Sequence, residues 1–134
     1  MTTLVPIELA TERAIVARLV LELLHNVKRQ YFPKGEFLDA VELALVGVYV
    51  FLAQQDCRPC TVTHLSRKTG LSRATVRRRT AHLVELGYVE SSSRRYLMGR
   101  GFAKPPGGRR IVQAHIAAIN SAARKLAKLA ANQT

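Results

Sequence analysis

Residues 61–91 read TVTHLSRKTGLSRATVRRRTAHLVELGYVES, and the helix caps and breakers in this stretch decide the fold. Thr63 can cap a short helix over residues 64–69, because its hydroxyl can accept a hydrogen bond from an unpaired amide of the first turn. Gly70 then stands where the end of a helix needs a left-handed backbone. Ser72 can cap a second helix directly after the turn. Two helices joined so tightly predict a helix-turn-helix motif, whose second helix enters a DNA major groove.

The second helix is predicted to run to Leu86, where Gly87 ends it, and to have two unlike sides. The buried side has residues at helical spacing, Val76, Thr80, Leu83 and Leu86, with Leu65 and Leu71 packing against them. The arginines of the helix fall mostly off this stripe. A buried face opposite a cationic face is what a groove-reading helix requires.

After this helix the pattern changes to that of a β-hairpin. Residues 88–90 and 94–98 are predicted to form two short strands joined by a turn, which together make a small wing. Residues 61–62 are predicted to add a third strand. Arg94 and Arg95 then stand at or near the wing tip, a position that suits contact with a phosphate or the minor groove.

The run from Thr61 to Ser91 resembles the winged helix-turn-helix of MarR-type transcription regulators. The resemblance lies in Thr-Val before the first helix, Gly-Leu-Ser at the turn and Leu-x-x-Leu-Gly-Tyr-Val after the second helix, and it covers about thirty of 134 residues. It implies a mainly α fold (an α+β winged helix) with N- and C-terminal dimerisation helices that interlock with a second subunit. It also implies sequence-specific binding of double-stranded DNA.

The basic charge of the chain is confined to its second half. The whole chain has 21 Lys and Arg against 9 Asp and Glu, a net charge of +12. Residues 1–60 hold 6 of the basic and 7 of the acidic residues, whereas residues 61–134 hold 15 and 2. Such a distribution is expected of a surface that binds a polyanion. A solvated basic face is the alternative, but the imbalance is larger than solubility requires.

The remaining sequence predicts long helices at both ends of the chain. Residues 6–31 show two neighbouring apolar rows, and residues 36–54 are apolar almost all round, as in a buried helix. Residues 99–110, rich in Gly, Pro and cations, predict an irregular connector or a basic arm that follows the minor groove. Residues 111–131 predict a last helix with an apolar row near heptad spacing, Ile116, Ile119, Ala123, Leu126 and Ala130.

These elements predict a single domain, residues 1–134, with three parts. The parts are N-terminal helices (1–55), a winged helix-turn-helix (59–98) and a C-terminal dimerisation helix (109–132). The apolar faces of both terminal helices are wider than the small winged helix-turn-helix can cover. We therefore expect a homodimer, in which a second copy covers these faces. Its two reading helices would enter successive major grooves ~34 Å apart on a near-palindromic site.

Nine residues are candidates for contact with DNA. The candidates for base edges are arginines of the second helix, since a guanidinium matches guanine O6 and N7: Arg73, Arg77 and Arg78. The candidates for phosphates lie on the first helix and the wing: Arg67, Lys68, Arg94 and Arg95. Ser72 and Thr75 complete the set, with Thr75 near a thymine methyl or a phosphate. For each arginine a phosphate contact or a solvated side chain is the alternative, and Arg79 is predicted to be structural.

Two further side-chain pairs suggest other chemistry. Cys57 and Cys60 have the C-x-x-C spacing of a thiol redox site, but they follow a helix instead of preceding one. We therefore expect reduced structural thiols, with redox sensing or a thiol redox enzyme as alternatives. His64 and His82 do not have the spacing of a zinc site, so we expect no metal and no cofactor. With no catalytic motif, we expect no enzyme activity.

A small-molecule effector is suggested by the family resemblance. The resemblance implies a phenolic or other amphipathic ligand between the dimer helices and the reader, where His25, Phe37, Tyr49 and Phe51 could line a crevice. The alternative is that these side chains are simply part of the core. A non-specific architectural DNA-binding protein is the alternative to a regulator.

No membrane segment is predicted. Residues 1–6 lack a basic region that leads into an apolar one, so we expect no secretory signal. The apolar run at residues 40–53 is interrupted by Glu42 and is too short to cross a bilayer. We therefore expect a cytoplasmic protein without a membrane partner.

Overall fold

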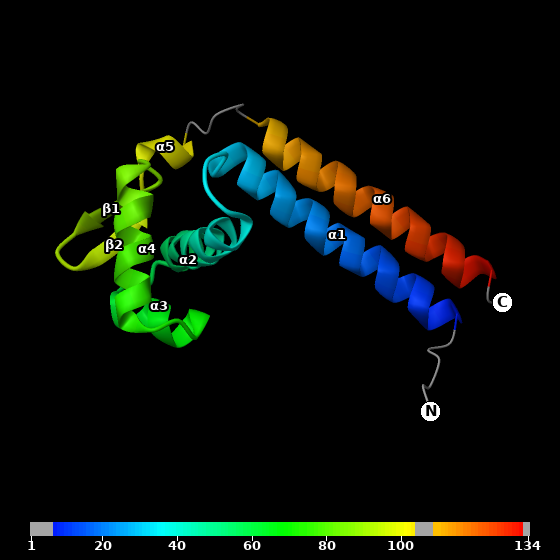
Figure 1. The fold of residues 1–134 in the computed structure, drawn as a ribbon, viewed down its shortest axis with the longest axis horizontal. Coiled ribbons are helices and arrows are strands. Elements are labelled where there is room, and N and C mark those ends of the chain that lie inside the picture. Colours follow the sequence, from blue (N-terminus) through cyan, green and yellow to red (C-terminus); the bar gives the residue numbers. More distant parts are fainter. Residues whose placement is uncertain (1–6, 104–108, 133–134) are drawn as a thin grey trace.

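The computed structural model describes residues 7–103 and 109–132, which form a head and a rod. The elements are α1 (Ile7–Tyr31), α2 (Phe37–Gln55), α3 (Val62–Thr69), α4 (Arg73–Glu85), β1 (Val89–Ser92), β2 (Arg95–Met98), α5 (Arg100–Ala103) and α6 (Arg110–Asn132). The head consists of α2, α3, α4, the β1–β2 wing and α5. The rod consists of α1 and α6, which lie side by side and project from the head (Figure 1). This mainly α architecture with a small antiparallel wing confirms the predicted fold class.

The core of the head lies between α2, α3 and α4. Its fully buried side chains come from all three helices and from the first residue of β1, and the largest are Val46, Val50, Leu65, Val76, Leu83 and Val89. Burying one such side chain contributes about 1.5 to 3 kcal/mol. Among the described residues, α2 alone is long and apolar enough to span a bilayer, with a mean hydropathy of 1.7. One side of α2, however, packs in this core.

The opposite side of α2 is not covered. Leu38, Leu45, Val48 and Leu52 are exposed, so the prediction of a helix buried all round holds on one side only. Other sides of α2 are packed against α3, α4, the wing and α1. Val48, at the border of the packed region, also lines an apolar pocket beside the end of α1.

In the rod, α6 packs lengthwise on α1. Ile111, Ala118 and Ala122 are the buried residues of α6. The alanines let the two helices approach closely, because they place little volume between the axes. With 25 residues, α1 is about 37 Å long.

The apolar row predicted for the last helix lies beside this contact and not in it. Ile116 and Ile119 are 51% and 47% exposed, and Ala123 and Ala130 are also exposed, whereas Leu126 is half-buried. On α1, Val16 and Val20 are likewise exposed, although the row through Ile15, Leu19 and Leu23 is half-buried. The rod therefore keeps an uncovered apolar side within the described residues.

Three local predictions are wrong. The cap of α3 is Thr61 and not Thr63, so residues 61–62 form no strand, and the described sheet contains β1 and β2 only. What remains of a third strand is one hydrogen bond, from the Tyr96 amide to the Cys60 carbonyl at 2.9 Å. Leu86 is 42% exposed, because α4 ends at Glu85 and Leu86 no longer follows the buried stripe.

The connector after the wing is partly helical. Residues 100–103 form α5, while residues 104–108 lie outside the described part of the chain, so the predicted basic arm is described only in part. The backbone of α5 is held against the end of α4: the amides of Gly99 and Gly101 donate to the carbonyls of Tyr88 and Gly87 at 2.8 and 3.0 Å. A Cβ on Gly99 would lie 2.5 Å from the Gly87 carbonyl oxygen. Only glycine permits so close an approach.

Candidate nucleic-acid interface

Side-chain hydrogen bonds fix the turn between α3 and α4. The Thr61 hydroxyl accepts from the His64 amide at 3.2 Å and begins α3, and Gly70 ends it with φ +78°. The Ser66 hydroxyl then donates to the Leu71 carbonyl at 2.7 Å. Finally, the Ser72 hydroxyl accepts from the Thr75 amide at 3.1 Å and begins α4. The predicted roles of Gly70 and Ser72 are therefore confirmed, and the angle between the two helices is set locally.

The inward side of α4 is fully packed. Val76, Thr80 and Leu83 are at most 1% exposed, as predicted. The Thr80 hydroxyl donates to the Val76 carbonyl at 2.9 Å, so this polar side chain is buried with its hydrogen bond made. The helix is thus held from behind and cannot rotate without opening the core.

Arg79 anchors α4 to α2. Its Nε donates to Glu42 Oε1 and its Nη2 to Asp39 Oδ1, each at 2.8 Å. Burial works against the charge of this guanidinium, but the hydrogen bonds and charges of Asp39 and Glu42 outweigh burial and raise its pKa. The prediction that Arg79 is structural agrees with this geometry.

The outward side of α4 carries the other arginines. Arg73, Arg77 and Arg78 are exposed. Ala74 and Ala81 are exposed between them on the same side, and sequence reasoning missed them. The 3.6-residue period was the signal that could have found them, because both lie opposite the buried stripe. Small side chains there let the helix axis come close to a surface, and an alanine can contact a thymine methyl.

The wing turn presents two more arginines. Ser92 pairs with Arg95, and between them Ser93 and Arg94 have φ values of +49° and +64°. Two left-handed residues in a two-residue hairpin loop fit a type I′ turn, where Asn-Gly is the favoured pair. Arg94 and Arg95 are both exposed. The structure thus places them at the wing tip and next to it.

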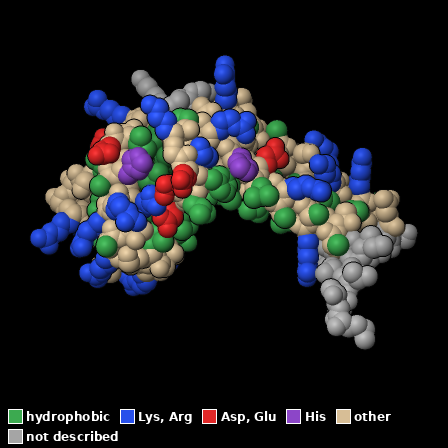
Figure 2. Space-filling model, in the orientation of Figure 1, with side chains coloured by type: hydrophobic (Ala, Val, Ile, Leu, Met, Phe, Trp, Pro, Cys, Tyr) green, Lys and Arg blue, Asp and Glu red, His purple; other side chains and the backbone are tan. Residues whose placement is uncertain are grey.

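The nine predicted DNA-contact residues all belong to the head. Thr75 is half-buried and bonded to Ser72, and the other eight are exposed, including Arg67 and Lys68 in the last turn of α3. Figure 2 shows Lys and Arg side chains over the outer surface of the head and along the rod, whereas hydrophobic side chains gather in the hollow between head and rod.

The two cysteines have unlike surroundings. Cys60 is buried, and burial raises the pKa of its thiol to about 11. Cys57 is exposed, with φ +53°, just after α2. A thiol with so high a pKa is almost entirely protonated at neutral pH, and the thiolate is the nucleophile in redox chemistry. Cys60 would therefore not be the attacking thiol of the pair, and that role would fall to the exposed Cys57.

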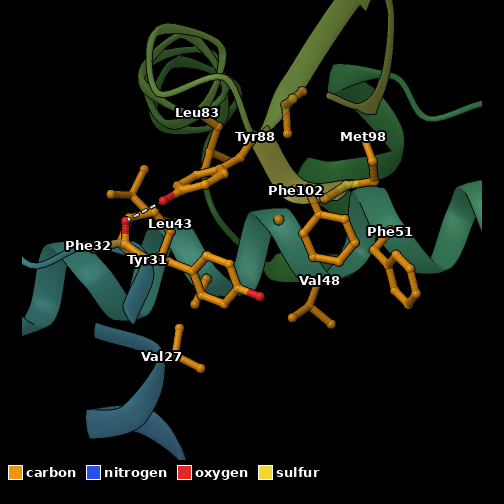
Figure 3. A pocket seen from close by; sticks show the side chains of 13 residues that line it. Val27, Tyr31, Phe32, Leu43, Val48, Phe51, Leu83, Tyr88, Met98 and Phe102 are labelled. Carbon is orange, nitrogen blue, oxygen red and sulfur yellow. Dashed lines mark hydrogen bonds between the residues drawn. The ribbon is translucent and has the colours of Figure 1, made fainter. Parts of the chain in front are cut away.

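The four residues expected to line a crevice have different surroundings in the structure. The rings of His25 and Phe37 stack on each other at 4.6 Å, and Tyr49 packs on the core. Of the four residues expected to line a crevice, Phe51 alone lines an apolar pocket where the end of α1 meets α2, the base of the wing and α5 (Figure 3). No group of three His, Cys, Asp or Glu side chains comes together among residues 7–103 and 109–132.

Comparison with protein families matches residues 51–93 to the IclR helix-turn-helix domain. The matched segment begins in the last turns of α2 and ends in the wing turn, so it contains α3, α4 and β1. Neither the curated proteins nor the solved structures yield a match to this chain. The match supports a winged helix-turn-helix regulator, but it does not support the MarR family specifically. The chain therefore carries a winged helix-turn-helix similar to the IclR domain, and sequence-specific DNA binding by a transcription regulator is the function that this domain supports.

Proposed function

We propose that this protein is a homodimeric transcription regulator that reads a specific double-stranded DNA site with the outward side of α4. The observation that carries the proposal is the division of that helix: Val76, Thr80 and Leu83 on its inward side are fully buried, while Arg73, Arg77 and Arg78 are exposed. The domain match suggests a regulator without enzyme activity. We expect it to work in the cytoplasm, because its target is genomic DNA.

In this proposal some arginines of the head contact base edges, and others contact phosphates. Arg77 and Arg78 flank Ala74 and Ala81 and approach base edges, where a bidentate contact with guanine is worth about 1 to 3 kcal/mol of discrimination. Arg67, Lys68 and the wing arginines hold phosphates, and Arg73, Ser72 and Thr75 lie at the start of α4, close to the backbone of the duplex. Phosphate contacts give affinity and register without sequence information.

The proposed dimer forms through the uncovered apolar side of the rod. Ile116 and Ile119 of α6 lie on that side, and an exposed aliphatic stripe on both rod helices is costly unless a partner covers it. A second copy supplies the same stripe by two-fold symmetry. Pairing of the rods in this way makes a four-helix bundle, as the interlocking terminal helices of MarR-type proteins would, and it holds two heads for one near-palindromic site.

Selection of bound fragments from a random duplex pool tests the reading function. We expect enrichment of one site with two half-sites, bound ~10³-fold or more above random duplex at physiological salt. Arg77→Ala should then weaken specific binding by about tenfold or more and non-specific binding much less. Arg95→Ala should weaken both equally and reduce the salt slope by about one. Arg124→Ala, on the exposed side of α6, is the matched control.

The outcomes separate the two DNA-binding functions. A pool without enrichment, together with equal losses for Arg77→Ala and Arg95→Ala, would refute sequence reading and establish a non-specific architectural protein. For the dimer, sedimentation at micromolar concentration should show two copies for the natural chain and for Lys125→Glu, but one copy for Ile116→Glu. A natural chain that sediments as a monomer would refute the dimer.

Responsiveness to a small molecule is the second part of this proposal. The observation that favours it is an apolar cavity where the rod meets the head. Its lining includes Tyr31, Phe32, Tyr88 and Phe102 and so differs from the crevice expected from the sequence.

A further inference from the structure

The outward side of α4 has one long side chain between two short ones. Arg78 comes midway in the sequence between Val76 and Thr80, which are both buried, so it lies on the side of the helix opposite to them. Ala74 comes four residues before Arg78 and Ala81 three residues after it, and both therefore lie on the same side as Arg78. All three are exposed. The helix thus presents alanine, arginine and alanine in a row.

The spacing of this row matches the spacing of base pairs along a major groove. Positions three or four residues apart on a helix are about one turn, or about 5.4 Å, apart. A helix that lies in the major groove contacts successive base pairs with positions about one turn apart, as each C2H2 zinc finger does with three residues and three base pairs. Ala74, Arg78 and Ala81 are therefore spaced to face three successive base pairs.

Each of the three side chains is complementary to one feature of a base edge. The guanidinium of Arg78 can donate two hydrogen bonds to O6 and N7 of guanine. The methyl groups of Ala74 and Ala81 have no polar atom, and the apolar feature of the major groove is the C5 methyl group of thymine. A longer side chain at either alanine would also hold the helix away from the base that Arg78 reaches.

The charges along α4 indicate which part of the helix enters the groove. Arg67 and Lys68 lie in the last turn of α3, just before the turn into α4, and the first turn of α4 has no acidic residue. Glu85, the last residue of α4, comes four residues after Ala81 and is exposed on the same side. Phosphates repel a carboxylate, so the helix should leave the duplex after Ala81. The row from Ala74 to Ala81 then lies in the part that enters.

We propose that in each half-site α4 reads a G·C pair flanked on both sides by A·T pairs, whose thymine methyl groups contact Ala74 and Ala81. This inference rests on the proposed function, because it names the bases that the same helix reads. It makes two small side chains determinants of specificity beside the arginines. Arg77 lies about 100° around the helix from Arg78 and therefore faces a different part of the groove.

The sequence selected from the random duplex pool is the first test. We expect both half-sites to contain a G·C pair with an A·T pair on each side. Arg78→Ala should lower the preference for the central G·C pair by about tenfold or more, whereas Arg77→Ala should keep that preference. An enriched site without the triplet, or loss of the central preference in Arg77→Ala alone, would overturn this inference and leave sequence reading intact. A pool without enrichment would instead refute the proposed function.

Deoxyuridine in place of thymine tests the methyl contacts, because it removes only the C5 methyl group. Fluorescence anisotropy of the full chain with the selected duplex should show about fourfold weaker binding for each flanking thymine replaced, as expected for one buried methyl group. Ala74→Gly should abolish this effect at one flanking position, and Ala81→Gly should abolish it at the other. Glycine also weakens α4 itself, but that cost is the same for both duplexes and cancels in the comparison.

The matched control is Ala127→Gly, at an exposed position of α6, which should keep the methyl effect at both flanking positions. Equal binding of the thymine and deoxyuridine duplexes by the natural chain would overturn the proposal. Methyl effects that persist unchanged in both Ala74→Gly and Ala81→Gly would overturn it as well. In that case the two alanines would serve only the helix, for which alanine is the most favourable residue.

Discussion

Replacing Arg79 by alanine should weaken the fold and leave DNA contacts in place, although three of its neighbours on α4 are proposed DNA-contact residues. The Arg79 side chain is 13% exposed and donates to Asp39 and Glu42 of α2. Its removal leaves two carboxylates three residues apart on α2 without a cation between them, and like charges at that spacing repel.

The magnitude follows from burial. A hydrogen bond to a charged group contributes about 1.5 to 3 kcal/mol when buried, whereas an exposed ion pair contributes about 0 to 1 kcal/mol. Asp39 and Glu42 are 51% and 35% exposed, so we discount the buried value and expect a loss of about 2 kcal/mol for the set. With an unfolding entropy of about 2.1 cal/mol/K per residue, this loss lowers the Tm by about 7 °C.

The assay compares Arg79→Ala with Arg78→Ala by thermal unfolding and by DNA binding. Arg78 is exposed and has no ion pair within the described residues, so its loss should change stability by less than about 0.5 kcal/mol while weakening DNA binding. The stability difference should shrink in 1 M salt, because the Arg79 pairs are partly exposed. An Arg79→Ala variant with unchanged Tm and reduced DNA affinity would refute the assigned anchor role.

Three further perturbations test other parts of the structure. Arg94→Gly should raise the free energy of unfolding in urea by about 1 kcal/mol, because glycine tolerates φ +64°, and it should lower DNA affinity. A lower free energy of unfolding would contradict the left-handed turn. Burial lowers the pKa of His115 from 6.5, so the unfolded chain binds a proton at this histidine more readily than the folded chain does. The free energy of unfolding should therefore be unaffected by this group above pH 6.5 and should fall as the pH drops below 6.5. His115→Leu should make the free energy of unfolding less dependent on pH in that range. Gly99→Ala should lower the Tm, because its Cβ would meet the Gly87 carbonyl, and an unchanged Tm would show that the backbone relaxes there.

The helix-turn-helix could be predicted because its determinants are local. Gly70 and Ser72 act within one turn of their own positions, and the stripe through Val76 and Leu83 follows the helical period. The choice between Thr61 and Thr63 as cap was not local. It depends on the Cys60 carbonyl, which accepts from Tyr96 of the returning strand and fixes where the chain turns into α3.

The family could not be read from the same residues. About thirty residues carry the skeleton of caps, turn and wing, and this skeleton is the part that winged helices share. The IclR match covers residues 51–93 and so rests on that skeleton, together with the end of α2.

The cavity was beyond sequence reasoning for a different reason. Tyr31, Phe51 and Phe102 come from three helices and Tyr88 from the segment between α4 and β1, and none belongs to a periodic pattern that includes the others. Phe102 lies on a helix of four residues, too short to show a period, and its position depends on backbone contacts between glycines. Only the packed chain brings these rings together.

The rod shows how a correct pattern can point to a surface instead of a core. The row through Ile116 and Ile119 is an apolar row of α6, yet α1 packs against the neighbouring face, which contains Ile111, Ala118 and Ala122. Small side chains suffice where two helices of one chain are already tethered close together. Larger aliphatic side chains are needed where association must overcome the entropy of joining two molecules. A packed face with Ala118 and Ala122 beside a face with exposed Ile116 and Ile119 is therefore the arrangement expected if one face serves folding and the other serves pairing.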